Sequence, residues 1–429
     1  MKKILTGILI AIWFLLLIFM GAVTFFIVNP DKAEALGAML SGNKADKASS
    51  ETVSEDDSSP SGQDAPVSRN NGIPEGVLGL KEPEIDPNGG LEVDLESAYE
   101  APSSSELNVP DNVSSRTGYE PVSGEEREIP DIEAINLYKE LSVGNTGDDL
   151  DFDPLYYPYY AMLGDKGKHL YRQIYANAMD LNGRFSPVER DLGTQGFKNV
   201  FASVVGDHPE LFWLDTSYEC LYDSHGQCAE VNLSFNRTAN DLEASKAEFD
   251  ANAEEILAGA RGLESDYEKE KYVHNALIDR IEYNAGAEMN QSAYSALVND
   301  STVCAGYARA FQYLMQQLQV PCYYCTGYAG EDHAWNIVKL DKDFYNADVT
   351  WDDTEGGQYD YFNKSDGDYR STHARTELAV YLPPCNGTEY SGLEQDDTPP
   401  PTAPQPEEEE WSPPQDDFEN YIITYHIVL

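Results

Sequence analysis

The chain has 429 residues, of which 76 are acidic and 28 basic, so its formal net charge at pH 7 is −48. This charge argues against a nucleic-acid-binding protein, because neutralising phosphates requires clustered lysine and arginine. It favours solubility and self-repulsion of extended segments. The length and the uneven composition indicate two packed units with tails rather than one ordinary domain.

Residues 1–30 are predicted to be a cytoplasmic tip followed by a transmembrane signal anchor. An uncharged, mostly apolar run extends from Ile4 to Val28, which is long enough at helical rise to cross a bilayer. Lys2 and Lys3 precede it, so the positive-inside rule places the N-terminus in the cytoplasm. We therefore expect a single-pass membrane protein whose region after the span is extracellular. A weak cleavage site at 33–35 leaves secretion after signal cleavage as the alternative.

Residues 31–128 are predicted to form a disordered acidic stalk. The segment is rich in Ser, Asp, Glu, Pro, Gly and Asn and has no lasting apolar period. Such a composition cannot bury enough surface to offset its chain entropy. Its expected role is to space the folded part from the membrane.

Residues 129–265 are predicted to form a mainly helical subdomain with a β-hairpin. Apolar residues recur at three- and four-residue steps in several segments, which is typical of amphipathic helices. The expected helices cover residues 132–141, 168–181, 197–205 and 239–261, with a further helix at 265–281 leading into the next unit.

The hairpin of this subdomain carries two cysteines. The runs LFWLDTSYECLY, ending at Tyr222, and CAEVNLSF, beginning at Cys228, alternate as strands do. Cys220 and Cys228 lie at the two ends of the short polar connection, so a disulfide between them is one interpretation for an exported chain.

A cysteine at a predicted helix start follows further along the chain. Ser301 or Thr302 is a natural N-cap, and the helix is expected to end at Val320-Pro321. Cys304 then falls in the first turn, where unpaired amides and the helix dipole favour a thiolate over a thiol. For this residue taken alone, a buried structural cysteine is the alternative.

A histidine and an aspartate occupy the two strands predicted after this helix. His333 opens HAWNIVKL and FYNADVTW follows a turn at 341–342. Pairing Leu340 with Asp343 would put His333 and Asp348 on one face as diagonal neighbours. A slip of one residue would separate them, so Asp352 and Asp353 remain alternative acids.

Cys304, His333 and Asp348 are the side chains of a thiol triad. His333 takes the thiol proton and returns it to the leaving group, while Asp348 fixes the tautomer of the imidazole. The amide of Gln291 is a candidate oxyanion or substrate donor, although solvent exposure accounts for it equally well. Trp335 and Trp351 are candidate walls of the acyl site or core residues.

These motifs resemble the transglutaminase-like family of the papain-like Cys-His-Asp superfamily, in particular its bacterial, membrane-anchored cell-surface members. The resemblance covers about Tyr267 to Tyr381 and rests on four segments: QSAYSALV (Gln291–Val298), VCAGYARAFQYL (Val303–Leu314), HAWNIV (His333–Val338) and DVTWDD (Asp348–Asp353).

The resemblance implies an α+β fold for residues 266–385. In such a core the nucleophile helix packs on an antiparallel sheet, with Cys304 as nucleophile, His333 as base and Asp348 as orienting acid. The preceding mainly helical subdomain, the transmembrane helix and disordered linkers complete the expected architecture.

The resemblance also implies a reaction type, because active members form a thioester on the cysteine and pass the acyl group to an amine or to water. We therefore predict an extracellular acyl transferase or cysteine-protease-like hydrolase that acts on an amide of a protein or cell-wall peptide. No cofactor, no metal site and no nucleic-acid partner is predicted, and no D-x-D-x-D-G calcium loop is present. A catalytically silent surface scaffold or binding protein is the alternative.

Residues 386–429 are predicted to form a Pro- and Glu-rich tail with an apolar end. The acidic run 407–410 lies within it, and the final segment 421–429 is β-prone. Pairing with a sheet edge and binding to a partner are both open for this last segment.

Overall fold

The computed structural model describes residues 85–92, 97–109, 118–354 and 358–393, all within one unit of the chain, Ile73–Leu429. The predicted membrane span, the first part of the predicted stalk and the apolar C-terminal end lie outside the described residues. Within the described ranges, no helix combines the length and the apolar composition that crossing a bilayer requires.

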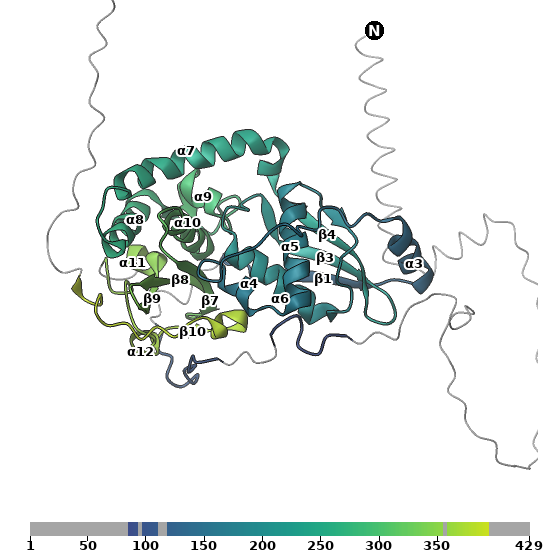
Figure 1. The fold of residues 1–429 in the computed structure, drawn as a ribbon. Helices are drawn as coiled ribbons and strands as arrows, with labels where there is room; N and C mark the ends of the chain where they lie inside the picture. The colour runs from purple at the N-terminus through teal and green to yellow at the C-terminus, as the bar shows by residue number, and fades with distance from the viewer. Residues whose placement is uncertain (1–84, 93–96, 110–117, 355–357, 394–429) are drawn as a thin grey trace, which may run out of the picture. The chain divides into compact units, whose positions relative to one another are not determined.

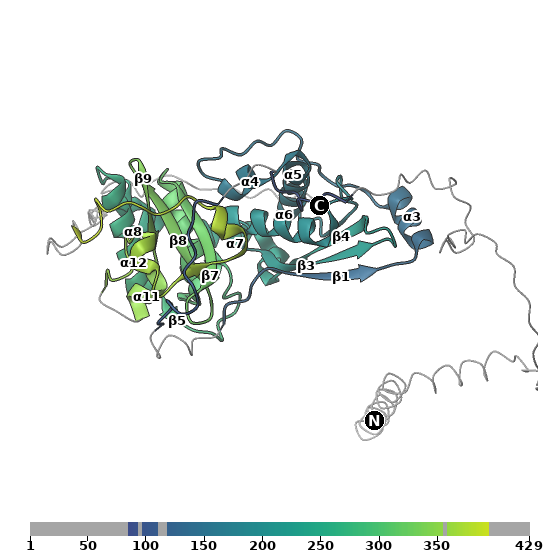
Figure 2. The same ribbon diagram turned by 90° about the horizontal axis from the view of Figure 1, so that it is seen from below.

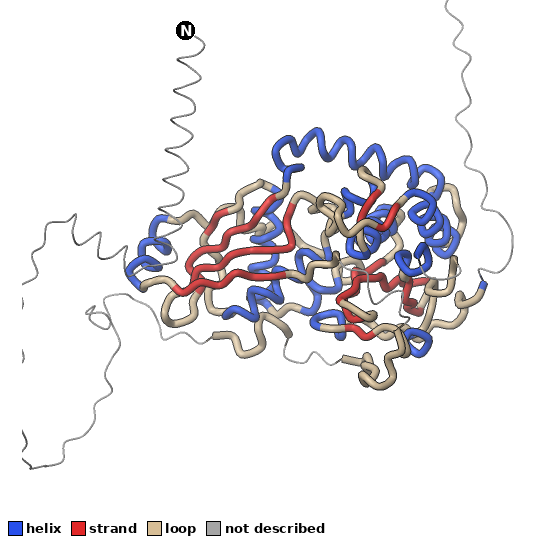
Figure 3. The backbone as a smooth tube through the Cα atoms, turned by 180° about the vertical axis from the view of Figure 1, so that it is seen from behind, coloured by secondary structure: helices blue, strands red, loops and turns tan. Residues whose placement is uncertain are grey.

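The first sheet has four strands in the order β1-β3-β4-β2, and Figure 3 shows its longer strands in red in front of the helices. β3 (Leu214–Tyr222) and β4 (Cys228–Phe235) form the predicted antiparallel hairpin. β1 (Ser123–Glu128) pairs in parallel with β3, and β2 (Arg184–Phe185) pairs with β4. The range 123–128 was predicted to end a disordered stalk, and the structure instead uses its backbone as an edge strand.

The predicted disulfide of the hairpin is not formed in this structure. Cys220 and Cys228 are both buried free thiols. Burial and the neighbouring Cys220 side chain raise the pKa of the Cys228 thiol. The two thiols are neighbours nevertheless, because the Cys220 side chain is hydrogen-bonded to that of Cys228.

Helices cover one face of the first sheet, as comparison of Figures 1 and 3 shows. The apolar periods predicted α5 (Asp165–Met179) and α6 (Gly193–Asp207), and buried aromatic and aliphatic residues of both helices join the main core. The short α4 (Pro158–Met162) precedes α5, and α3 (Asp131–Glu140) packs on Leu221 and Ala229 of the hairpin.

Two longer helices connect the first sheet to the second. The 3-10 helix η1 (Arg237–Asp241) leads into α7 (Leu242–Ala260), which is followed by α8 (Asp266–Arg280). Ser265 caps α8 in a capping box with Glu268, so two of the backbone N–H groups at this helix end are satisfied. The predicted helices at 239–261 and 265–281 are thus confirmed within a few residues.

The second sheet supports the nucleophile helix. Its strand order is β10-β7-β8-β9, and all neighbouring strands are antiparallel. The strands are β7 (Cys322–Tyr328), β8 (Asp332–Leu340), β9 (Asp343–Ala347) and β10 (Ala374–Arg375). Leu340 pairs with Asp343, which confirms the register predicted from the turn at 341–342.

The helix α10 (Cys304–Gln317) packs on this sheet, and a buried asparagine joins them. Asn336 of β8 donates from Nδ2 to the Ala308 carbonyl of α10 at 2.9 Å. The same nitrogen donates to the Tyr323 carbonyl of β7 at 3.3 Å. Asn336 therefore fixes the nucleophile helix relative to the strand that carries His333.

Short elements complete the second layer. β5 (Glu282–Tyr283) pairs in parallel with β6 (Ser301–Thr302), and α9 (Ala293–Leu297) lies between them in the chain. After β9 come α11 (Val349–Thr354), α12 (Asp366–Tyr369) and the 3-10 helix η2 (Glu377–Tyr381). The described part of the chain is a mixture of helices and sheets, as the α+β prediction requires.

Two local predictions differ from the structure. Val303 is the N-cap of α10 without a side-chain cap, because Ser301 and Thr302 are used as strand β6. The strand expected to run through Asp348 ends at Ala347, since α11 begins at Val349.

Described parts of the predicted stalk lie against the folded unit. The Asp86 N–H donates to the Asp191 carbonyl at 2.6 Å, and Ser97 Oγ donates to the Val380 carbonyl at 2.5 Å. Val109 packs against a small cluster that contains Trp351. These contacts are made by single backbone groups and isolated side chains. They require no repeating apolar pattern, so the sequence pattern does not predict them.

Candidate active site

Cys304 is the first residue of α10 and is 2% exposed. The first residues of a helix have N–H groups without an intrahelical carbonyl, so the sulfur lies where backbone donors and the helix dipole are available to an anion. Its apolar neighbours are Ala308, Tyr324 and Ala334, with Tyr119 packed against them. The segment just before α10 is held to the preceding loop, because Thr302 Oγ1 donates a hydrogen bond to the Asn290 carbonyl at 2.8 Å.

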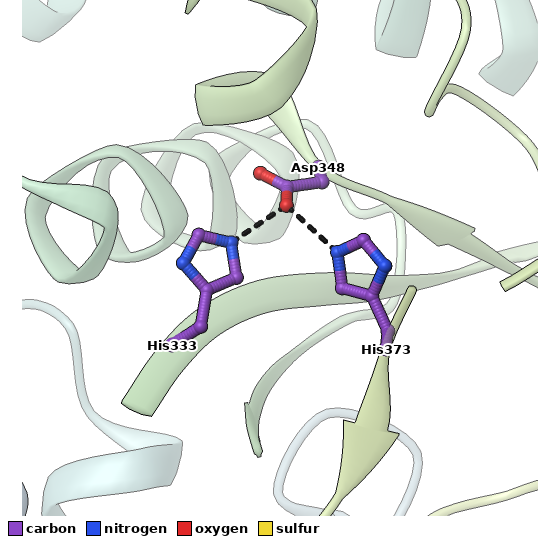
Figure 4. A group of neighbouring side chains, drawn as sticks. All are labelled: His333, Asp348 and His373. Atoms are coloured by element: carbon purple, nitrogen blue, oxygen red, sulfur yellow. Dashed lines mark hydrogen bonds and ion pairs between the residues drawn. The ribbon is translucent and has the colours of Figure 1, made fainter. Parts of the chain in front are cut away.

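The structure brings the predicted histidine and aspartate together. His333 Nε2 and Asp348 Oδ2 are 2.7 Å apart, and both side chains are buried (Figure 4). Asp348 directly follows β9, and its Oδ1 accepts a hydrogen bond from the Trp351 N–H at 3.1 Å in the first turn of α11. The carboxylate is therefore held by the helix that follows it. Since Nε2 of His333 faces Asp348, Nδ1 is the ring nitrogen left for the thiol.

Electrostatic contacts join Cys304 to this pair. Burial lowers the pKa of His333, but Asp348 and Cys304 outweigh burial through charge and side-chain hydrogen bonds and raise that pKa to about 10. Burial raises the pKa of Asp348, yet His333 and His373 together bring it well below the usual carboxyl range. An ionised carboxylate next to a readily protonated imidazole is the arrangement that accepts a proton from a neighbouring thiol.

His373 is a member of this site that sequence reasoning missed. Its Nε2 lies 3.1 Å from Asp348 Oδ2, so the same carboxylate oxygen faces two imidazoles (Figure 4). Thr372 Oγ1 lies 2.8 Å from the other ring nitrogen. Burial lowers the pKa of His373 to about 4, against the opposing effect of Asp348, so this ring is neutral at physiological pH. It lies just before β10 and far from the recognisable motifs, so no sequence signal marks it.

The two alternative acids lie elsewhere. Asp352 Oδ2 is 3.0 Å from His274 Nε2, and Asp352 Oδ1 accepts a hydrogen bond from the Tyr361 N–H at 2.7 Å. Asp353 accepts a hydrogen bond from the Tyr307 hydroxyl at 2.6 Å. Asp348 is therefore the carboxylate beside His333. His274, the partner of Asp352, is a fully buried histidine.

The two predicted tryptophans surround the imidazoles. Trp351 lies 4.4 Å from His373 between ring centroids and 5.8 Å from His333. Trp335 lies 5.1 Å from His373 and 6.2 Å from His333, and its Nε1 donates to Asn346 Oδ1 at 3.0 Å. Both rings are buried, so they exclude water from the histidine–carboxylate pair.

Gln291 has partners in the chain itself. Its Nε2 donates to the Gly118 carbonyl at 2.6 Å and to Asn290 Oδ1 at 2.7 Å. Its Oε1 accepts a hydrogen bond from the Glu120 N–H at 3.0 Å. In this structure the predicted oxyanion or substrate donor therefore holds the backbone of residues 118–120.

The sequence predicts no metal site, but the structure contains a cluster of side chains whose ligand atoms are of the kinds that bind metals. Ligand atoms of His333, Asp348 and His373 lie within 4.8 Å of one another, and two imidazoles with one carboxylate are a combination that transition metals use. In the structure both nitrogens face the same carboxylate oxygen, and these contacts fully account for the arrangement as a hydrogen-bonded network (Figure 4).

One protein-family profile matches part of the chain. The sequence profile of the Transglutaminase-like superfamily matches residues 253–349, which include Cys304, His333 and Asp348 but end before His373. No curated protein matches the chain.

Three solved structures show limited likeness. They are a TGase (16% identity, 30% of this chain and 41% of that one, TM-score 0.23), a proposed cysteine protease from Cytophaga hutchinsonii (22%, 27% and 39%, TM-score 0.21), and the periplasmic domain of TgpA from Pseudomonas aeruginosa (14%, 29% and 55%, TM-score 0.20). The chain thus aligns with less than two thirds of the length of each of these proteins. The family profile thus locates a transglutaminase-like domain at residues 253–349 of the chain.

Proposed function

We propose that the protein catalyses thiol-dependent acyl transfer or hydrolysis at an amide bond of a protein or peptide, through a thioester on Cys304. The observation that carries this proposal is the contact of Cys304 with His333, whose other nitrogen faces the ionised, buried Asp348. An orienting acid, a base and a sulfur nucleophile are the complete set for this chemistry.

In the proposed mechanism, the thiol proton of Cys304 passes to His333 before the attack, so that a thiolate lies beside an imidazolium, and the thiolate sulfur then attacks the amide carbonyl. The C–S bond forms as the carbonyl oxygen becomes negative, and we assign N–H groups in the first turn of α10, which begins at Cys304, as its backbone donors. His333 then gives its proton to the departing amine as the C–N bond breaks. An amine or water attacks the thioester with His333 as base, and the thiol is restored.

Asp348 keeps its negative charge throughout and stabilises the imidazolium that forms. His373 stays neutral and supplies a second hydrogen bond to the carboxylate. Trp335 and Trp351 keep water from this pair, which strengthens its electrostatic interactions. The proton therefore moves only between the sulfur, His333 and the reacting nitrogen.

We further propose that the reaction takes place outside the cell, on protein or cell-wall peptides, with the chain anchored by residues 4–28. The apolar run and the preceding lysines support this location.

The test is incubation of the full chain with glutamine-containing peptides and cell-wall fragments, with and without a primary amine, and identification of products by mass. Loss of ammonia with amine incorporation indicates transfer, and gain of water indicates hydrolysis. Cys304→Ala should abolish both products, whereas Cys220→Ala, a buried cysteine of the other sheet, should retain them. We expect EDTA to leave the rate unchanged. Equal turnover by Cys304→Ala would refute the proposal.

A surface scaffold without turnover is the second candidate, and the low exposure of Cys304 favours it. The two candidates differ in one readout. An enzyme forms a thioester on Cys304 that hydroxylamine cleaves, and a scaffold binds the same peptides without forming it.

A further inference from the structure

A tyrosine from the chain before β1 lies over the nucleophile. Tyr119 packs against the buried cluster of Cys304, Ala308, Tyr324 and Ala334. Its hydroxyl is hydrogen-bonded to that of Tyr324, and burial together with the neighbouring Tyr324 and Cys304 raises the pKa of Tyr119. This ring therefore contributes to the 2% exposure of Cys304.

Gln291 holds the backbone on both sides of this tyrosine. It donates to the carbonyl of Gly118 at 2.6 Å and accepts from the N–H of Glu120 at 3.0 Å. Gln291 therefore binds only backbone groups, the carbonyl of the residue before Tyr119 and the N–H of the residue after it. These two hydrogen bonds place no requirement on the side chain at the position between them. The side chain that packs beside Cys304, that of Tyr119, thus belongs to the residue between the two backbone groups that Gln291 binds.

Gly118 fits closely beside the nucleophile helix. A Cβ on this residue would lie 2.8 Å from Cγ1 of Val303 and 3.0 Å from Cβ of Ala285, and its φ is +129°. Val303 is the residue before Cys304, so the chain approaches the site where only a small residue fits. From there it leads into β1 of the first sheet (Figure 2).

Space continues beyond this segment. Glu120, Pro121, Gln291 and Arg309 border a cavity of about 390 Å³. Arg309 is buried, lies 4.5 Å from the Tyr324 ring and has an Nε atom without a partner among the described residues. A longer peptide following the same path would therefore meet polar groups and a positive charge after the position of Glu120.

We propose that residues 118–120 are an internal occupant of the peptide-binding groove that inhibits the enzyme until a substrate displaces it. The inference rests on the proposed function of Cys304. It also defines the substrate: an extended peptide with a small residue at the position of Gly118, followed by a residue whose side chain reaches the sulfur. Gln291 is then a specificity residue that binds the backbone of either occupant.

The first experiment measures access to the sulfur. Full-length protein is alkylated with iodoacetamide and followed by intact mass, and peptide mass mapping assigns the modification to Cys304 among the six buried cysteines. If the segment covers the site in nine molecules of ten, Tyr119→Ala should raise the alkylation rate of Cys304 roughly tenfold. Gly118→Val should act in the same direction, because its side chain meets Val303.

The matched control is Tyr99→Ala. Tyr99 belongs to the same part of the chain, and its ring contacts Arg375 at 4.6 Å rather than Cys304, so this variant should alkylate at the wild-type rate. Cys304→Ser should remove the signal. Alkylation of a folded Tyr119→Ala variant at the wild-type rate overturns the proposal, and so does an equal rise in Tyr99→Ala.

The second experiment tests occupancy by a peptide. The peptide Gly-Tyr-Glu-Pro-Val, copied from residues 118–122, should slow alkylation of Tyr119→Ala and should fail to slow it when Gln291→Ala is added. Peptide libraries in the Tyr119→Ala background should select small residues before the reacting residue. Absence of protection by the peptide would contradict a shared groove.

These readouts separate the two proposals. Greater alkylation without turnover of any peptide would leave the internal occupant standing and refute the enzyme. Equal turnover by wild type and Tyr119→Ala would do the reverse.

Discussion

Asp348 organises the candidate site at the scale of single residues. One of its oxygens faces both His333 and His373, and the other is bound by the backbone of α11. The two imidazoles differ in charge because His333 also meets Cys304, whereas burial dominates for His373. One carboxylate thus holds a charged ring and a neutral ring, and only the charged ring contacts the sulfur.

Replacing Asp348 with asparagine should lower kcat/KM roughly 10²–10⁴-fold, because the imidazole loses its orienting acid. The pKa of His333 should also fall, since the carboxylate raises it against burial. The raised pKa contributes stability that is complete below the unfolded value of about 6.5 and is lost as pH rises through about 10. We therefore expect the alkaline limb of activity and of thermal stability to move to lower pH in Asp348→Asn, measured by pH–rate profiles and thermal melts. An unshifted alkaline limb would contradict this account.

His373 is a positioning residue in the proposed mechanism. His373→Leu should lower kcat by roughly 10–100-fold, the usual effect of removing a group that orients a site residue, while KM changes little. His373→Gln retains a donor toward Asp348 and should recover much of the loss. Steady-state kinetics of both variants make the test, and equal kcat values for the leucine and glutamine variants would show that the hydrogen bond is unimportant.

At the scale of elements, two buried polar links hold the parts of the site in register. Asn336 joins β8 to α10, and His274 of α8 joins Asp352 of α11 at 3.0 Å. Burial raises the pKa of Asp352 to about 6, although His274 and the Tyr361 N–H oppose the shift. The helix that follows Asp348 is thus fixed to α8 through a second histidine–aspartate pair.

His274→Ala should destabilise the fold by about 3–5 kcal/mol, because it leaves a buried carboxylate unpaired. The measurement is chemical denaturation at pH 7. His225→Ala, at an exposed position of the first hairpin, is the control and should change stability by less than about 0.5 kcal/mol. A loss below about 1 kcal/mol in His274→Ala would show that the pair contributes little.

At the scale of the whole molecule, described residues before β1 contact residues near both the first and the second sheet. Gly89 lies against Asn199 near the first sheet, while Tyr99, Val109 and Tyr119 contact the second. These attachments replace part of the stalk that composition predicts.

A chain that begins at Pro121 should therefore melt at a lower temperature than one that begins at residue 85. Each kcal/mol of lost contact energy lowers the midpoint by roughly 2–4 °C for a unit of this size. The shorter chain should also alkylate faster at Cys304. Equal melting temperatures, measured by calorimetry, would show that the N-terminal contacts contribute no stability.

The sequence by itself determined the helices with clear apolar periods, the hairpins, and the proximity of His333 to Asp348. The last follows from parity, because a turn at 341–342 sets which residues share a face. Apolar periodicity was less accurate for the ends of some elements. Ser301 and Thr302, predicted to cap a helix, form a strand, and Asp348, predicted to lie in a strand, lies between β9 and α11.

Only the tertiary structure decided the remaining features of the site. His373 reaches Asp348 because β10 pairs with β7, and Gln291 holds residues 118–120 across a separation of more than 170 positions in the chain. Both contacts depend on single side chains brought together by distant strand pairing. Apolar periodicity along one element reflects which of its faces is buried. It contains no information about which polar side chain of a distant element will lie against that face.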